Sequence, residues 1–192
     1  MNTKVLVGCE ESGTFRDALK KKGIYAKSVD LQPSSSPGLH YTGDIFHVID
    51  QGWTHLIAFP PCTYLCKAQL WQCVPGTKRA ADRDKAVEFV LSLVSSGIPH
   101  ISIENPSGYL SKAFRPPSQI VRPWWFGDPY DKEICLWLTN LPPLIATCYN
   151  PIRKSVSNHT NSRMTQKQRS RIRSSWKYYP GMVEAMINQW FP

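Results

Sequence analysis

The chain has 192 residues and a net charge of +9; 42% of its residues are hydrophobic and 19% are charged. This composition is typical of a globular protein rather than a disordered or membrane-embedded one, and the length predicts a single domain over 1–192. No stretch approaches the ~20 apolar residues of a membrane helix, and the N-terminus has no signal-peptide pattern, so we expect a cytoplasmic protein.

The six cysteines are scattered through apolar stretches, which favours free thiols over a disulfide framework. The only close group is Cys62, Cys66 and Cys73, with spacings of four and seven residues. A zinc site there would lack the CxxC pairs of well-defined zinc motifs and is weakly supported.

Positive charge is concentrated in the C-terminal part, residues 134–192. This part holds eight Lys/Arg residues and one acid, Glu184, and so carries +7 of the net +9. A polyanion-binding face and a solvated basic loop explain such segregation equally well. We expect a polar, basic arm at 150–177 and a closing helix at 180–191.

The chain opens with a β-branched run at 3–8 that stops at Gly8, followed at 12–23 by helical spacing of Phe15 and Leu19. Similar patterns predict strands at 24–31, 54–61 and 99–106, and an antiparallel pair of strands at 119–126 and 133–139. Gly43, Asp44 and Ile45 are expected to open a short helical stretch, residues 78–96 a helix, and 67–77 irregular structure. This alternation predicts an α/β class, with a Rossmann-like, mostly parallel sheet and helices on both faces.

Polar groups follow four of the predicted strands and turns. They are the turn from Gly8 to Gly13, Asp30, the Pro-Pro-Cys turn ending at Cys62, and the pair Glu104-Asn105. Ligands of open α/β sheets bind outside the carboxyl ends of the strands, so these groups are expected to meet. Each alone has a structural explanation, since glycines make tight turns and acids cap helices.

The first turn, GCEESG, favours a cofactor that carries a ribose and a positive charge. It lacks the GxGxxG spacing of dinucleotide sites, and Glu10 and Glu11 would repel a pyrophosphate. Asp30, seventeen residues after Gly13, is placed like the acid that binds ribose hydroxyls. S-adenosylmethionine has these features, and Asp44 is expected to accept from its adenine amino group. The predicted cofactor contacts are Gly8, Cys9, Glu10, Ser12, Gly13, Asp30, Leu31, Asp44, Ile45 and Pro60.

Pro61-Cys62 after one strand and Glu104-Asn105 after the next resemble the catalytic pair of the DNA cytosine-5 methyltransferases, especially the short versions of phages and prophages. The stretch 119–144 and the ending RSRIRSSWKYYPGMVEAMINQW are also similar to segments of those proteins. The resemblance implies a methyltransferase fold, S-adenosylmethionine as cofactor, cytosine in DNA as substrate and, for a phage protein, the host cytoplasm.

The resemblance also implies residue roles. Cys62 is expected to add to carbon 6 of cytosine, Glu104 to act as the acid at ring nitrogen 3, and Asn105 to hold the loop. Arg122 is the best match for the family's arginine that contacts the base and steadies the catalytic loop. Stacking of Arg122 on a neighbouring tryptophan is an equally good interpretation.

The chain also departs from that family. Only about 146–162 stands where full-length members carry a large target-recognition domain, so we expect a relaxed or short sequence context. Phosphate contacts are predicted for five basic residues of the arm: Arg163, Lys167, Arg169, Arg171 and Arg173. Single-stranded DNA, a free cytosine or uracil nucleotide, and a role as an inactive methyltransferase-like binding module remain open alternatives.

Overall fold

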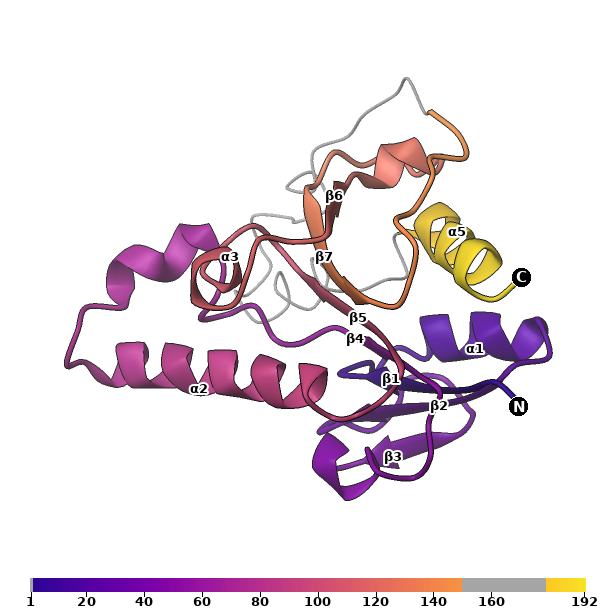
Figure 1. Ribbon diagram of the computed structural model, residues 1–192, viewed down its shortest axis with the longest axis horizontal. Coiled ribbons are helices and arrows are strands. Elements are labelled where there is room, and N and C mark those ends of the chain that lie inside the picture. The colour runs from indigo at the N-terminus through magenta and orange to yellow at the C-terminus, as the bar shows by residue number, and fades with distance from the viewer. Residues whose placement is uncertain (1, 150–178) are drawn as a thin grey trace.

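The computed structural model describes residues 2–149 and 179–192, and its centre is a seven-stranded sheet (Figure 1). The strands are β1 (Lys4–Gly8), β2 (Tyr25–Asp30), β3 (His40–Thr42), β4 (His55–Ala58), β5 (His100–Asn105), β6 (Gln119–Val121) and β7 (Ile134–Thr139). The helices are α1 (Thr14–Lys21), α2 (Lys78–Val94), α3 (Leu110–Ala113) and α5 (Pro180–Trp190), with 3-10 turns η1 (Ile45–His47), η2 (Lys67–Gln72) and η3 (Pro123–Trp125).

The strand order is β3-β2-β1-β4-β5-β7-β6. The first five strands of this order pair in parallel, and β7 pairs antiparallel with both β5 and β6. The carboxyl ends of β1, β2, β4 and β5 therefore lie along one edge of the sheet, where the predicted site residues follow them.

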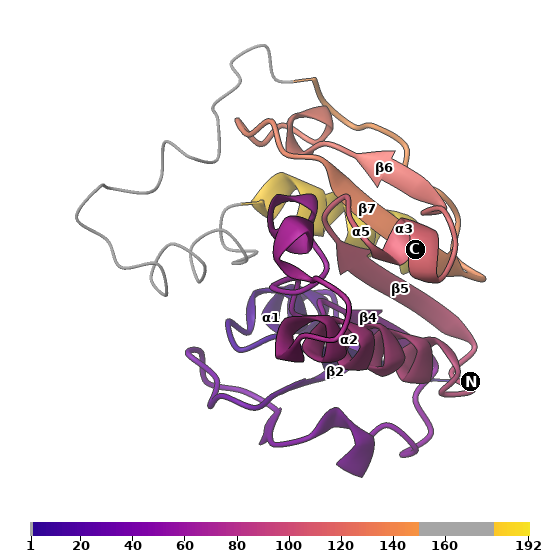
Figure 2. The same ribbon diagram turned by 90° about the vertical axis from the view of Figure 1, so that its left-hand side faces the viewer.

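Helices cover both faces of the sheet (Figure 2). On one face α1 and α5 pack side by side over a core that includes Phe15, Leu19 and Met186. On the other face α2 and α3 cover a second core that includes Val90 and Leu93. Burying apolar side chains on two faces explains why the central strands are nearly continuous apolar runs.

Most of the predicted elements are confirmed, and the differences have local causes. The strand expected at 119–126 ends at Val121, because Pro123 has no N–H for the ladder and opens η3. The stretch 67–77, expected to be irregular, contains the 3-10 turn η2. β3 and the one-turn helix α3 were not predicted, since both are too short to show a periodic pattern.

The predicted basic arm at 150–177 lies outside the described residues, as do its five predicted phosphate-binding side chains. The described part of the chain holds no helix that combines the length and the hydrophobicity needed to cross a membrane.

Candidate active site

The turn after β1 buries a glutamate. Glu10 is only 3% exposed, and its Oε1 accepts from the Ser12 hydroxyl at 2.7 Å and from the Phe15 backbone N–H at 3.1 Å. Burial raises the pKa of Glu10, although these hydrogen bonds and the charge of Arg16 act against the rise. Among the described residues no donor reaches Glu10 Oε2.

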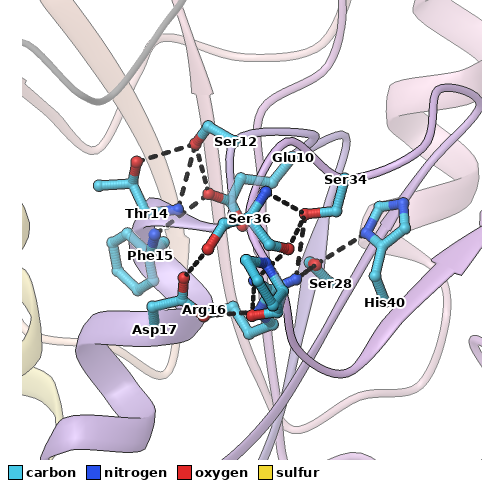
Figure 3. A network of polar contacts seen from close by, with 11 residues as sticks. Glu10, Ser12, Thr14, Phe15, Arg16, Asp17, Ser28, Ser34, Ser36 and His40 are labelled. Atoms are coloured by element: carbon cyan, nitrogen blue, oxygen red, sulfur yellow. Dashed lines mark hydrogen bonds and ion pairs between the residues drawn. The ribbon is translucent and has the colours of Figure 1, made fainter.

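Arg16 organises the neighbouring loop, which the sequence did not reveal (Figure 3). Its guanidinium is 1% exposed and forms an ion pair with Asp17 at 2.8 Å. It also donates to the Ser28 and Ser34 hydroxyls and to the carbonyls of the 36–37 segment. Arg16 thereby fixes the loop between β2 and β3, and Gly13 and Gly38 leave room for its side chain.

The ends of β1, β2 and β3 meet beside this turn. The Glu10 N–H donates to the Val29 carbonyl at 3.2 Å, and the Gly43 N–H donates to the Asp30 carbonyl at 2.9 Å. Burial, together with the negative charges of Asp30 and Asp44, raises the pKa of Cys9 to about 12. Cys9 is therefore a neutral thiol between the two acids at neutral pH.

The two acids predicted to bind the cofactor each accept a backbone hydrogen bond. Asp30 Oδ1 accepts from the Gln32 N–H at 2.9 Å, and Asp44 Oδ1 accepts from the Phe46 N–H at 3.0 Å. Leu31, next to Asp30, is 72% exposed. This edge thus presents two carboxylates and an apolar side chain to a ligand.

Two other predicted cofactor contacts have a packing role. Ile45 is 4% exposed and lies so close to Gly8 that a Cβ there would come within 2.7 Å of Ile45 Cδ1. Gly8 therefore allows Ile45 to pack against the end of β1, and this contact brings η1 to the edge of the sheet.

Asn105 connects its own strand, β5, to the loop that carries Cys62, residues 59–66, which we call the thiol loop. Its Nδ2 donates to the Pro60 carbonyl at 2.8 Å, and the Asn105 side chain is buried. The next residues turn tightly, since the Leu65 and Cys66 N–H groups both donate to the Cys62 carbonyl at 3.0 Å. Asn105 thus fixes the loop on which Cys62 lies.

Glu104 and Cys62 share one nearby cation, Lys132. Glu104 is 9% exposed, and its Oε1 has no hydrogen-bond donor among the described residues, but the Lys132 Nζ lies 3.9 Å away. Burial raises the pKa of Glu104, and Lys132 partly offsets this. Burial and then the charge of Glu104 raise the pKa of Cys62, which Lys132 again lowers.

Lys132 was not predicted as a site residue, whereas Arg122 was. The Arg122 guanidinium forms ion pairs with Asp131 and, at 2.7 Å, with Glu133. These two acids flank Lys132, so Arg122 braces the turn that carries the lysine. The charge run Asp-Lys-Glu gave no signal for Lys132, because only the pairing of β7 with β5 brings it to Glu104.

The described residues contain no group of three His, Cys, Asp or Glu side chains arranged to hold a metal ion. A hollow of about 600 Å³ lies between α1 and α5, and neither Cys62 nor Glu104 lines it. The chemistry-bearing groups are instead those at the carboxyl edge of the sheet.

Comparisons with known proteins bear on the fold. No family model matches the chain, and no curated protein matches its sequence. Solved structures do match: the Dnmt2 methyltransferase of S. pombe at a TM-score of 0.51 and 15% identity, and the Entamoeba histolytica methyltransferase EhMeth at 0.51 and 14%. The alignments cover 88% and 87% of this chain but only 62% of each of those chains.

This chain has the Rossmann-like methyltransferase fold. S-adenosylmethionine is the cofactor expected from the sequence, and the residues at the carboxyl edge are of a kind that fits that group. Glu10 Oε2 is a buried carboxylate oxygen that no donor in the described part of the chain reaches, which suits an ammonium, and Asp30 is a partly exposed carboxylate, which suits a ribose hydroxyl.

Proposed function

We propose that this protein is an S-adenosylmethionine-dependent methyltransferase that acts on carbon 5 of cytosine in DNA through a covalent intermediate on Cys62. The observation that carries the proposal is the hydrogen bond from Asn105 to the Pro60 carbonyl. It couples the thiol loop to the strand end that presents the buried Glu104. The short sequence context expected from the chain, and its likeness to phage proteins, belong to the same proposal.

The cofactor supplies an electrophilic methyl group, and the chain supplies the groups that bind it. In the proposal Glu10 receives the ammonium, Asp30 the ribose and Asp44 the adenine amino group, with Leu31 against the adenine. The backbone from Gly8 to Gly13 and Pro60 line the same space. Ser12 donates to Glu10, so it orients the carboxylate rather than meeting the ligand alone.

The reaction follows from the poor nucleophilicity of cytosine carbon 5. The Cys62 thiolate adds to carbon 6, and the electron pair displaced from the ring double bond is accommodated as Glu104 donates its proton to nitrogen 3. Carbon 5 then attacks the methyl group, and the bonding pair to the methyl stays on the sulfur of the demethylated cofactor, which leaves. A base removes the carbon 5 proton, the ring double bond re-forms as the carbon–sulfur bond breaks and the thiolate leaves, and nitrogen 3 returns its proton to Glu104.

The arrangement of charge suits this sequence of proton movements. Burial raises the pKa of Glu104, which favours the protonated form that donates, and the Lys132 charge offsets part of the rise that burial and Glu104 cause in the pKa of Cys62. We propose that Lys132 is the cation next to the base and that Arg122 is a positioning residue acting through the turn it braces. The arm residues Arg163 to Arg173 would add phosphate contacts that do not read sequence.

Methyl transfer from labelled S-adenosylmethionine tests the proposal. The protein is incubated with separate pools of duplex DNA, single-stranded DNA, RNA and free cytosine or uracil nucleotides, with Cys62→Ala as the matched variant. Incorporation into a DNA pool that vanishes in Cys62→Ala is expected. Incorporation that survives in Cys62→Ala contradicts the mechanism, and labelling of nucleotides or RNA alone contradicts the substrate.

A DNA oligonucleotide with 5-fluorocytosine gives an independent test. Fluorine at carbon 5 blocks the elimination, so the protein should be trapped on the DNA in a complex that survives denaturing electrophoresis. Cys62→Ala should form no such complex. Tight DNA binding without trapping or methylation would instead indicate a binding module.

A further inference from the structure

A tryptophan on the segment that follows the thiol loop is unusually exposed. Trp71, at the end of η2, is 75% exposed, and Val74 just beyond it is 54% exposed. Cys73 between them is 5% exposed and packs inward. A large aromatic ring in solvent contributes little to the core and is accessible for contact with a ligand.

The segment carrying Trp71 starts at a fixed point beside the site. The Tyr109 N–H donates to the Leu65 carbonyl at 2.7 Å, and the Lys67 N–H donates to the Ser107 carbonyl at 3.3 Å. Gly108 allows this contact, because a Cβ there would collide with the Leu65 backbone. The start of η2 is therefore held against residues 107–109, which follow the end of the strand that carries Glu104.

Two arginines of α2 pack on tyrosines of the loop before η2 and of the segment after β5. The Arg83 guanidinium lies over the Tyr109 ring, with 4.2 Å to the centroid, and the Arg79 guanidinium lies over the Tyr64 ring at 5.2 Å. The loop is thus attached before and after η2, which keeps Trp71 at a set place relative to Cys62.

The charge around Trp71 suits a polyanion. Residues 51–81 contain no Asp or Glu, and neither do residues 106–127. Exposed lysines lie on these stretches at Lys67, Lys78 and Lys112. An exposed aromatic ring on a stretch with lysines and no acid, which continues the loop that carries Cys62, has the composition of surfaces that bind single strands.

We infer that Trp71 is a stacking platform for a base of an unpaired strand, with Lys67 and Lys78 contacting its phosphates, so that the target cytosine is taken from single-stranded nucleic acid. The inference rests on the proposed function and narrows its substrate. Bases of a duplex are already stacked on one another, so a side-chain ring reaches a base face only at the cost of unstacking. An unpaired strand presents its bases without that cost.

Fluorescence anisotropy tests this inference. It measures binding of the protein, without cofactor, to a labelled 16-nucleotide single strand of DNA and to the matching DNA duplex. Trp71→Ala should weaken single-strand binding by about 5- to 100-fold, which corresponds to one stacked base. Duplex binding should change less than twofold. Ile145→Ala is the matched control, because Ile145 is also 75% exposed; its affinities should stay at the wild-type value.

Two further variants separate stacking from charge. Trp71→Phe should recover part of the lost affinity, because a smaller ring still stacks. Lys67→Gln should weaken both substrates alike and lower the slope of log affinity against log salt by about one. Circular dichroism should show that all variants keep the wild-type fold.

Several results would overturn the inference: equal losses on single strand and duplex in Trp71→Ala, no loss on either, or tighter wild-type binding to the duplex. These outcomes differ from a failure of the proposed function, because binding needs no methyl transfer. If methylation fails but Trp71→Ala weakens single-strand binding, the protein binds single strands as inferred and the proposed methyl transfer is wrong. If Cys62-dependent methylation occurs and Trp71→Ala binds normally, only the stacking platform is wrong.

Discussion

Two buried glutamates lie at the carboxyl edge of the same sheet, and their surroundings differ. Glu10, after β1, has two hydrogen-bond donors on one oxygen, Ser12 and the Phe15 backbone, and the Arg16 charge nearby. Glu104, near the end of β5, has no hydrogen-bond donor on its Oε1 among the described residues, and the Lys132 ammonium lies 3.9 Å from that oxygen. Burial raises the pKa of both.

The difference indicates two chemical tasks for the same side chain. Donors that stabilise the charged form suit a carboxylate that receives a cation, and this is the task proposed for Glu10. A buried carboxyl with few donors has a raised pKa, which favours the protonated form that can give up a proton, as proposed for Glu104. Substitutions on each side can break this distinction.

The largest effect is expected for Glu104→Gln, which keeps the size of the side chain but removes the acid. Methyl transfer should fall by about 10²- to 10⁴-fold. The free energy of unfolding of Glu104→Gln should not fall with the activity, and at high pH it should equal or exceed that of wild type. Because the pKa of Glu104 is raised in the folded state, wild-type stability falls as pH increases from the ordinary carboxyl pKa through the raised one.

Urea unfolding at pH 8 checks the second part of that prediction. Glu104→Gln should be at least as stable as wild type there, since it has no charge to bury. Glu88→Gln, on the exposed face of α2, is the control and should change neither quantity. A Glu104→Gln protein that is inactive because it is less stable would contradict the assignment.

The surroundings of Glu10 include the buried guanidinium of Arg16, which holds the loop between β2 and β3. Arg16→Met should lower the free energy of unfolding by about 3–5 kcal/mol, because it leaves buried partners of the guanidinium without their charge. Chemical denaturation measures this. Lys20→Met on the exposed side of α1 should cost less than about 0.5 kcal/mol, and equal losses in the two variants would refute the buried network.

Glu10→Gln should weaken S-adenosylmethionine binding by about 10- to 100-fold, which is the contribution of one hydrogen bond to a charged group. The fold should be kept, because the amide oxygen still accepts from Ser12. Isothermal titration calorimetry measures the affinity, and Glu11→Gln, the exposed acid next in the chain, is the control. Unchanged affinity in Glu10→Gln would remove Glu10 from the cofactor site.

The smallest effect is expected at Lys132. Lys132→Met removes the cation that lowers the pKa of Cys62, so less thiolate is present at a given pH. Alkylation of Cys62 by iodoacetamide at pH 8 should slow by about two- to fivefold, as for a partly exposed ion pair. Lys132→Arg should restore the rate.

Mass spectrometry of the alkylated peptides reports this rate at Cys62 alone. The exposed Cys148 serves as a reference within the same molecule, and its rate should be equal in all variants. A normal Cys62 rate in Lys132→Met, or a loss that Lys132→Arg does not repair, would show that Lys132 does not tune the thiol.

Local pattern was sufficient for much of the fold. The parallel strands β1, β2, β4 and β5 are short apolar runs bounded by glycine, proline or acids, and their prediction is confirmed. The 3-10 turn η3 was missed although Pro123 marks it, because the aromatic residues around it resemble a strand. β3 has no buried residue and exists only through its pairing with β2.

The sequence by itself determined the α/β class and the positions of Cys62, Glu104 and Asn105 at strand ends, because these follow from chain order and side-chain periodicity. Only the tertiary structure decided their partners. From the sequence Arg16 is expected to be an ordinary surface residue of a helix. Its burial depends on a loop twenty residues further along the chain. Lys132 reaches Glu104 only because β7 runs antiparallel to β5. Such contacts depend on strand pairing, which no short stretch of sequence encodes.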